Sequence, residues 1–370
     1  MARSDPLWLA APSRFAGLRK AHARLALALL ALLVAACFAA LAIGDPPALG
    51  ASSGGDRNRT DLGVYEDIVA GVRGGGNYYE VAADALRAGG YPLRPFLTMR
   101  QPALAAAEAS MPPWLPGMLL VALALFTGMA WMLRLTEAMP RLAPRLIAAL
   151  LLAGSMLAFF QPGLAAFHEI WAGLLVALSL ALRRPGRWIE AAAIGLAAML
   201  IRETAALYVL VMAVFAWREG ARREAMGWGA ALLLFAAVLG VHAWAVAGVT
   251  GPNDPASPGW LGLQGPGLFV KGIALSTALQ LVPLWAAAPL VGLALFGWAS
   301  WNDPLAARAL ALFAGYALAL ALFARLDTFY WALMASPVIL AGLAFVPDGL
   351  RDLARQSLDR RRVTVTRIAQ

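Results

Sequence analysis

Apolar residues fill most of the chain in blocks that approach the length of a membrane span. A transmembrane helix needs about 20 apolar residues, and about ten blocks come close to this length: 25–43, 115–135, 146–162, 167–182, 188–202, 203–217, 227–249, 284–301, 305–323 and 329–346. The blocks between 146 and 217 are short, so they either cross fully or pair as half-depth hairpins. A further apolar stretch, 268–283, is expected at the outer membrane interface. The pattern predicts an all-α polytopic membrane protein with about ten transmembrane helices.

The composition supports this class and excludes an ordinary soluble domain. Of the 370 residues, 61% are hydrophobic and 14% are charged, which is typical of an integral membrane protein. The formal net charge of +9 does not indicate a nucleic-acid partner, because the positive residues lie in short loops and in the C-terminal tail, beside membrane lipids. The first apolar block is too long for a typical signal-peptide core, so we expect a retained anchor.

Few residues suggest a metal site or a cofactor, and neither is predicted. The single cysteine, Cys37, lies inside the first apolar block, so no disulfide within the chain and no cysteine metal site is possible. The three histidines are too scattered for a histidine-rich centre. Of these, His242 lies within an apolar block and is expected to be a core residue with satisfied hydrogen bonds.

The positive residues also predict the orientation of the chain. Segments between blocks alternate between Arg-rich ones and short loops that hold only Arg202, Lys271 and Arg325. Since Lys and Arg accumulate on the cytoplasmic side, residues 1–24 form a cytoplasmic segment and residues 347–370 a basic cytoplasmic tail. The transmembrane domain, 25–346, is expected in the cytoplasmic (inner) membrane, with an active site that faces the periplasm or another extracytoplasmic space.

The first outside loop, about residues 44–114, is the one sizeable soluble segment. Its Gly-, Pro- and Ser-rich start is expected to be irregular. Apolar residues at helical spacing in 61–73 predict an amphipathic helix on the membrane surface. Residues 74–90 predict a turn and a second helix, and the prolines of 91–102 favour an extended chain.

Ionisable residues at the outer ends of the spans are the main candidates for function, because charges at membrane depth are costly. Asp61, Glu66 and Asp67 follow the first span. A partly desolvated carboxylate there could act as a general base toward an acceptor hydroxyl. The alternative is the solvated polar face of a surface helix.

Arg202 and Glu203 interrupt an apolar run. They form either a structural ion pair between two short helices, or a site in which Arg202 binds a lipid phosphate and Glu203 orients it. Arginine suits phosphate because its planar fork makes paired, charge-assisted hydrogen bonds. Arg325 and Lys271 are further candidates for the same phosphate.

His168 and Glu169 lie together at the outer end of another span. They are not a zinc-protease motif, since no second histidine follows at the required spacing. The pair is expected either to contact an acceptor or a phosphate, or to cap the helix.

Two segments resemble GT-C-type glycosyltransferases, multispan enzymes such as the protein O-mannosyltransferases and aminoarabinose transferases. The segment TDLGVYEDIVAGV resembles the start of their first extracytoplasmic loop, with Asp61 four residues before Tyr65 and Leu62 in the place of the family's second acid. The segment ARLDTFYWALMASP resembles the start of a late span of the family, with Arg325, Tyr330 and Pro337 at the matching positions. Together they cover about a tenth of the chain, and the plan of about ten spans with one large first loop agrees at the level of architecture only.

The resemblance implies an inverting glycosyltransferase of GT-C-like fold. A polyprenyl-phosphate-linked sugar would be the donor, and a hydroxyl on a glycan, lipid or protein would be the acceptor. Asp61 would be the catalytic base, while basic residues would bind the donor phosphate. Two other classes stay open: a lipid or solute transporter, and a non-catalytic subunit of a polysaccharide export system.

Overall fold

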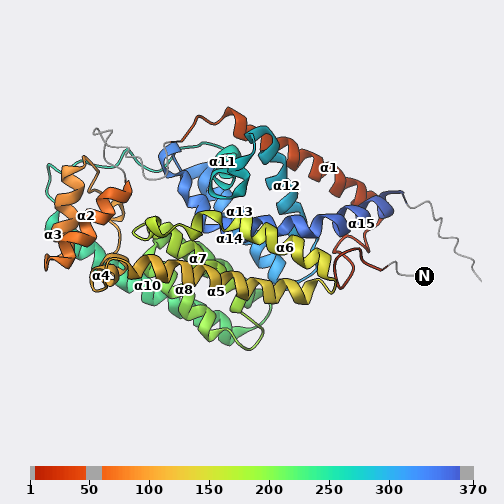
Figure 1. Ribbon diagram of the computed structural model, residues 1–370, viewed down its shortest axis with the longest axis horizontal. Helices are drawn as coiled ribbons and strands as arrows, with labels where there is room; N and C mark the ends of the chain where they lie inside the picture. The colour runs from red at the N-terminus through yellow and green to blue at the C-terminus, as the bar shows by residue number, and fades with distance from the viewer. Residues whose placement is uncertain (1–4, 47–60, 359–370) are drawn as a thin grey trace, which may run out of the picture.

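The computed structural model describes residues 5–46 and 61–358, and every regular element in that part of the chain is a helix (Figure 1). Only two isolated β-bridges accompany the helices of these residues. The expected irregular start of the first loop falls largely in 47–60, and much of the basic tail falls in 359–370, both outside the described residues. The predicted all-α class is therefore confirmed for the described chain.

Four helices are long and apolar enough to cross a membrane. They are α1 (Lys20–Cys37), continued by a 3₁₀ turn (Phe38–Ala42), and α5 (Leu115–Ala138), α10 (Arg222–Val249) and α13 (Pro304–Phe323). A fifth candidate is the pair Leu326–Met334 and Ser336–Leu358, which is bent by 54° and whose last part is α15 (Val346–Leu358). All five correspond to blocks predicted from the sequence.

The other apolar helices are shorter, so the count of about ten full crossings is not confirmed. They are α6 (Leu142–Ser155), α7 (His168–Leu182), α8 (Ile189–Ile201), α9 (Ala206–Arg218), α11 (Pro266–Ser276) and α12 (Leu284–Ser300). At 1.5 Å per residue, a helix of 14 residues extends about 21 Å, less than the ~30 Å hydrocarbon core.

Helix α11 is a buried element, although the sequence favoured a position at the membrane interface. Nearly all of its side chains, including Lys271, are buried. It packs between α12, α13, the 3₁₀ turn after α1 and the segment Leu326–Met334. An all-round apolar helix is typical of such an interior position.

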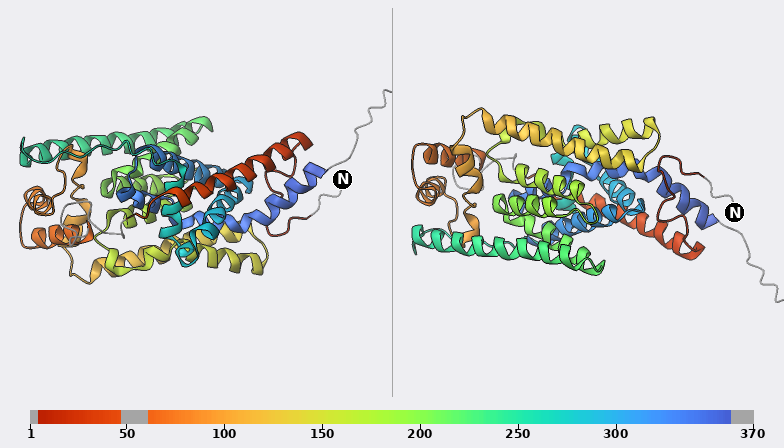
Figure 2. Two further views of the ribbon diagram at one scale, coloured as in Figure 1. Left: turned by 90° about the horizontal axis from the view of Figure 1, so that it is seen from above. Right: turned by 90° about the horizontal axis from the view of Figure 1, so that it is seen from below.

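Three short helices form a cap at one end of the elongated molecule: α2 (Asp61–Arg73), α3 (Tyr78–Ala88) and α4 (Ala103–Ala109) (Figures 1 and 2). The first two are the helices that the sequence predicted. Asn77 caps α3 by accepting a hydrogen bond from the Tyr79 backbone, as N-terminal asparagines commonly do. The cap has its own apolar core, which includes Val64, Ile68 and Val246 of α10.

The described N-terminal segment and α15 lie together at the opposite end (Figure 2). Backbone N–H groups of Leu7, Trp8 and Leu9 all donate to the buried carboxylate of Asp348. This clamp holds the two ends of the described chain on the same side of the helix bundle.

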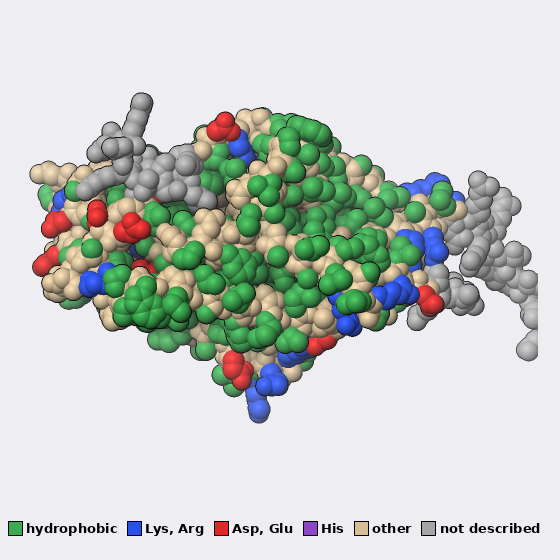
Figure 3. All heavy atoms as spheres, viewed as in Figure 1, with side chains coloured by type: hydrophobic (Ala, Val, Ile, Leu, Met, Phe, Trp, Pro, Cys, Tyr) green, Lys and Arg blue, Asp and Glu red, His purple; other side chains and the backbone are tan. Residues whose placement is uncertain are grey.

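The surface between the two ends is apolar. Figure 3 shows hydrophobic side chains over the middle of the visible face and most Lys and Arg toward the end that carries the N-terminus. Large apolar side chains such as Leu150, Leu233 and Trp244 are 74–79% exposed. A contiguous exposed apolar surface of this kind marks contact with membrane lipid.

Candidate active site

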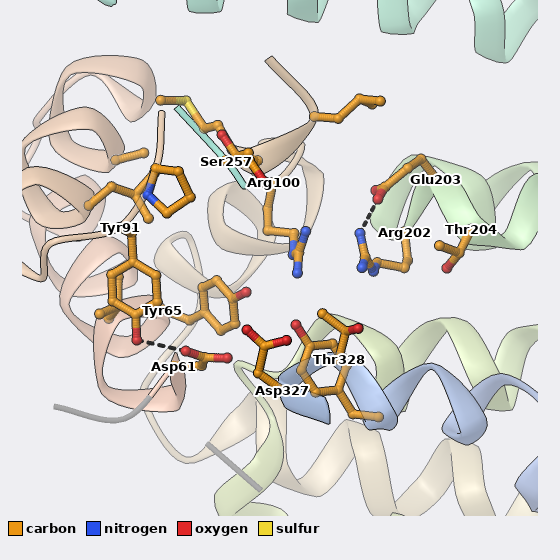
Figure 4. Close-up of a pocket in the computed structure, with 18 of the residues that line it drawn as sticks. Asp61, Tyr65, Tyr91, Arg100, Arg202, Glu203, Thr204, Ser257, Asp327 and Thr328 are labelled. Atoms are coloured by element: carbon orange, nitrogen blue, oxygen red, sulfur yellow. Dashed lines mark hydrogen bonds and ion pairs between the residues drawn. The ribbon is translucent and has the colours of Figure 1, made fainter. Parts of the chain in front are cut away.

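A cavity of about 270 Å³ lies between the cap and the helix ends below it (Figure 4). Its walls come from α2, from the chain before α4, from the turn between α8 and α9, and from the segment after α13. The polar and aromatic residues that line it are Asp61, Tyr65, Tyr78, Tyr91, Thr98, Arg100, Arg202, Glu203, Thr204, Ser257, Trp260, Arg325, Asp327, Thr328, Tyr330 and Trp331. Residues far apart in the sequence therefore share one polar pocket.

Asp61 is the first residue of α2, and its carboxylate lines the cavity (Figure 4). The hydroxyl of Tyr91 donates to its Oδ1 at 2.6 Å. Burial raises the pKa of the Asp61 carboxyl above its usual value, and the hydrogen bond from Tyr91 opposes this rise. Asp327, whose negative charge also faces Asp61, raises the pKa further. A partly desolvated carboxylate of this kind is suited to accept a proton.

Two buried arginines reach into the same cavity. Figure 4 shows the guanidinium groups of Arg100 and Arg202 extended toward the same space. The Arg100 side chain is 12% exposed and that of Arg202 only 2%. Between them they place two positive charges, both on side chains with little exposure to solvent, at the wall of the cavity.

Glu169 lies beneath the arginines and neutralises part of their charge. Its fully buried carboxylate is 2.5 Å from Nε of Arg202 and 3.7 Å from an amino group of Arg100. Arg202 also pairs with Glu203 beside it. The guanidinium of Arg100 is held less firmly than that of Arg202, and it is therefore freer to bind a ligand.

Several buried donors in the cavity wall have no hydrogen-bond partner among the described residues. They are Nε of Arg100, Oγ1 of Thr204 and Nε1 of Trp331. An unpaired buried polar group costs about 1–3 kcal/mol, so native structures pair such groups with ligand or water. A ligand that brings acceptor oxygens into the cavity would satisfy these donors.

Arg325 also lines the cavity, but its guanidinium is engaged within the protein. It makes a two-point pair with Asp327, at 3.1 and 2.9 Å, and donates to the Gly259 carbonyl at 3.1 Å. The aromatic ring of Tyr330 contributes another wall and packs edge-on against Phe167, with 5.3 Å between ring centroids. Arg325 is thus better placed to fix Asp327 and the nearby loop than to bind a phosphate.

The cavity brings together most, but not all, of the residues that the sequence singled out. Those that line it are Asp61, Tyr65, Arg202, Glu203, Arg325 and Tyr330. Glu169 touches the site only through the arginines, and His168 lies behind Tyr65, whose ring meets it edge-on at 4.9 Å.

Three of the other candidates, Glu66, Asp67 and Lys271, lie outside the cavity. Glu66 and Asp67 are exposed on another face of α2, where the solvated-face interpretation applies. Lys271 donates to the carbonyls of Ile43 and Gly44 and pairs with Asp45 at 2.8 Å, so it ties down the chain that follows α1. His242 is buried and bonds to Tyr79 and Met99, as expected of a satisfied core histidine.

Sequence reasoning missed Arg100 and Tyr91. Both lie in the Pro-rich segment 91–102, which the sequence identified only as extended chain. The segment carries two arginines that the sequence alone does not distinguish, and the other one, Arg94, donates to the Asp254 carbonyl. Within the described ranges, no group of three or more His, Cys, Asp or Glu side chains could hold a metal ion.

No family model matches this chain, and comparisons with curated proteins and with solved structures give no match. Function is therefore inferred from the geometry of the cavity and from the two short sequence resemblances.

Arg202→Ala is expected to destabilise the protein. The change would leave the buried Glu169 with only the distant Arg100, and breaking a buried ion pair on one side costs about 3–5 kcal/mol. Thermal unfolding in detergent should show a clear loss of stability for Arg202→Ala and a smaller loss for Arg202→Lys. An unfolding temperature equal to that of the wild type would contradict this structural role.

Proposed function

We propose that this chain is an inverting membrane glycosyltransferase that transfers a sugar from a polyprenyl-phosphate donor to an acceptor hydroxyl. The observation that carries the proposal is the shared cavity in which the Asp61 carboxylate lies with the buried guanidinium groups of Arg100 and Arg202. A proton acceptor and an anion-binding wall in one cavity are what this reaction requires. The acceptor is a hydroxyl on a glycan, a lipid or a protein.

The reaction follows from these groups. Asp61 accepts the proton of the acceptor hydroxyl as that oxygen attacks the anomeric carbon of the sugar. The bond from this carbon to the phosphate oxygen breaks on the opposite face, so the configuration inverts. Arg100 and Arg202 stabilise the negative charge that gathers on the departing lipid phosphate. The protein contributes mainly orientation and a preorganised charge distribution.

The donor phosphate is assigned to Arg100 and Arg202 in preference to Arg325. Arg100 has an unpartnered Nε, and the unpartnered hydroxyl of Thr204 comes two residues after Arg202 in the sequence. Arg325 is already saturated by Asp327 and Gly259. The sugar ring then lies between this arginine wall and Asp61, beside Tyr330 and Trp331 of the cavity wall.

The architecture supports a GT-C-like plan in a coarse way. One helical cap follows the first long apolar helix, as the resemblance implies, and the cavity lies directly under it. In this proposal the short helices α6 to α9 and α12 complete about ten spans, and the cap faces the periplasm.

The rival classes make different demands on the cavity. A transporter would release its substrate unchanged, and a carboxylate in its pathway would take up a coupling proton and not activate a hydroxyl. A non-catalytic subunit needs no buried unpartnered donors such as those of Arg100 and Trp331. The unpartnered donors favour a ligand-binding protein over a structural subunit, and cleavage of the donor distinguishes an enzyme from a transporter.

Mass spectrometry of cells with and without this chain tests the function. Loss of the chain should remove one sugar from a cell-envelope glycan, lipid or protein and cause the polyprenyl-phosphate sugar to accumulate. Unchanged glycans and unchanged lipid-linked sugars would contradict the proposed transferase.

The topology gives a further prediction, since both termini are assigned to the cytoplasm and the cap to the opposite side. Ser110→Cys places a thiol at an exposed cap position, and Ala354→Cys places one at an exposed position on α15. In intact cells, a membrane-impermeant thiol reagent should label the first and not the second. The native Cys37 is buried and provides the background control. Labelling of both sites, or of α15 alone, would contradict the orientation.

A further inference from the structure

A second, much smaller cavity lies behind Tyr65, inside the helical cap. Its volume is about 10 Å³, and it is bounded by α2, α3, α4 and the start of α7. Two of its lining residues are polar and almost fully buried: Glu108 of α4 is 5% exposed and His168 of α7 is 3% exposed. The cavity described above uses neither residue.

Both side chains carry polar atoms that no described residue satisfies. Oε1 of Glu108 has no hydrogen-bond partner, and neither ring nitrogen of His168 has one. Each such atom costs about 1–3 kcal/mol when it is buried and unpaired. Buried water commonly satisfies groups of this kind, and a space of roughly 10–15 Å³ holds one molecule.

We propose that this cavity binds one water molecule, which bridges Oε1 of Glu108 and a ring nitrogen of His168, and that the protonation state of Glu108 controls the bridge. The protonated acid and one ring nitrogen of a neutral imidazole each form a hydrogen bond with this water. Ionised Glu108 places a negative charge in the same apolar space, and Arg73 compensates it only in part.

The surroundings of Glu108 set the pH at which this change occurs. Burial raises the pKa of the Glu108 carboxyl to about 7; the charge of Arg73 lowers it, and that of Glu66 raises it slightly. Arg73 does not pair with the carboxylate, because it donates to the Glu108 backbone carbonyl at 2.9 Å. Tyr78 of α3 and His168 of α7 are the other titratable groups that share the small cavity with Glu108 and Tyr65.

Tyr65 connects the two cavities, since it lines both. One side of its ring meets His168 at 4.9 Å, and the guanidinium of Arg100 lies 6.0 Å from the ring centroid. His168 is therefore a positioning residue, because it packs against the ring on which Arg100 rests, and the proposed water would link Glu108 to it. Their influence on the donor phosphate rests on the proposed function, whereas the water site itself does not.

The sign of the effect on stability follows from the raised pKa. The folded state prefers protonated Glu108, so this stabilisation is complete at low pH and is lost as the pH rises through about 7. The unfolding temperature of the wild type should therefore fall as the pH rises from about 5 to about 7. Glu108→Gln removes the titration, so its unfolding temperature should fall less and should exceed that of the wild type by about 2–4 °C at the alkaline end.

Thermal unfolding of the full-length protein in detergent, from about pH 5 to about pH 9, tests this across the range in which Glu108 titrates. Glu80→Gln, an exposed acid on α3 that does not contribute to the pKa of Glu108, is the matched control and should follow the wild type. A protonated-carboxylic-acid band in the infrared spectrum should disappear near neutral pH in the wild type and in Glu80→Gln, and this component should be missing from the spectrum of Glu108→Gln. A Glu108→Gln variant with the wild-type slope and an unchanged infrared band would overturn the proposal.

A high-resolution density map of the wild-type protein tests whether the water molecule is present, independently of any variant. The proposal expects density for one water molecule between Glu108 and His168, and an empty cavity would overturn it. None of these measurements depends on sugar transfer, so failure here and failure of the transferase proposal are separate results.

Discussion

Replacing Asp61 by Asn should lower turnover by about 10²–10⁴-fold, the usual contribution of a general base. Asn keeps the shape of the side chain but cannot accept a proton. The Tyr91 hydroxyl can still donate to its amide oxygen, so the fold around α2 should survive. Donor binding and protein level should therefore stay close to those of the wild type. With a radiolabelled polyprenyl-phosphate sugar, equilibrium binding measures the affinity for the donor and initial rates measure turnover.

The same carboxylate predicts the pH dependence of the wild type. The base must be ionised, and burial raises its pKa. The rate should accordingly fall on acidification at a higher pH than an exposed aspartate would give. In Asp61→Asn this acidic limb should be absent from the residual activity.

Asp67→Asn and Glu66→Gln are the matched controls for Asp61→Asn, because both acids lie on α2 but are exposed and outside the cavity. They should retain nearly full turnover. Full activity in Asp61→Asn together with loss of activity in either control would remove Asp61 from the mechanism.

Replacing Arg100 by Ala should weaken use of the lipid donor about tenfold to a hundredfold, since a charge-assisted contact contributes about 1.5–3 kcal/mol. Arg100 is the cleaner test of the phosphate site, because Glu169 keeps its closer partner Arg202 when Arg100 is lost. The effect should appear in kcat/KM for the donor. Arg100→Lys should restore activity only in part, because the planar fork is lost.

Arg94→Ala is the control for Arg100→Ala. It comes from the same extended segment, but its exposed guanidinium donates to the Asp254 carbonyl outside the cavity. Arg325→Ala should act mainly through the freed Asp327, with less effect on donor affinity than Arg100→Ala. Wild-type donor kinetics in Arg100→Ala would place the phosphate elsewhere.

The sequence predicted helices well because their signals are local. The amphipathic spacing of α2 and the asparagine and paired glycines around α3 are written in neighbouring residues, and both helices form where they were expected. The number of helices that cross the membrane completely could not be predicted in the same way. Hydropathy does not reveal that the helices around the cavity stop at 13–15 residues, as α7, α8 and α9 do.

The candidate site was predictable where a charge interrupts an apolar block. Arg202 stood out for this reason, and it lies in the cavity wall. Lys271 stood out equally, yet it binds the chain after α1, because tertiary packing decides what a buried cation meets. Arg100 lies in a polar, Pro-rich segment where a charge is unremarkable, and only the three-dimensional path of that segment brings it opposite Arg202.

The central claim is that the cavity cleaves a lipid-linked sugar and passes it to a hydroxyl. The most direct measurement is to reconstitute the purified protein in vesicles with a polyprenyl-phosphate sugar and a hydroxyl acceptor, and to follow the free polyprenyl phosphate together with the anomeric configuration of the product. The account predicts equal amounts of free lipid phosphate and of a product with inverted configuration from the wild type, and almost none from Asp61→Asn. A donor that stays intact with the wild-type protein, or that crosses the bilayer without cleavage, would contradict it.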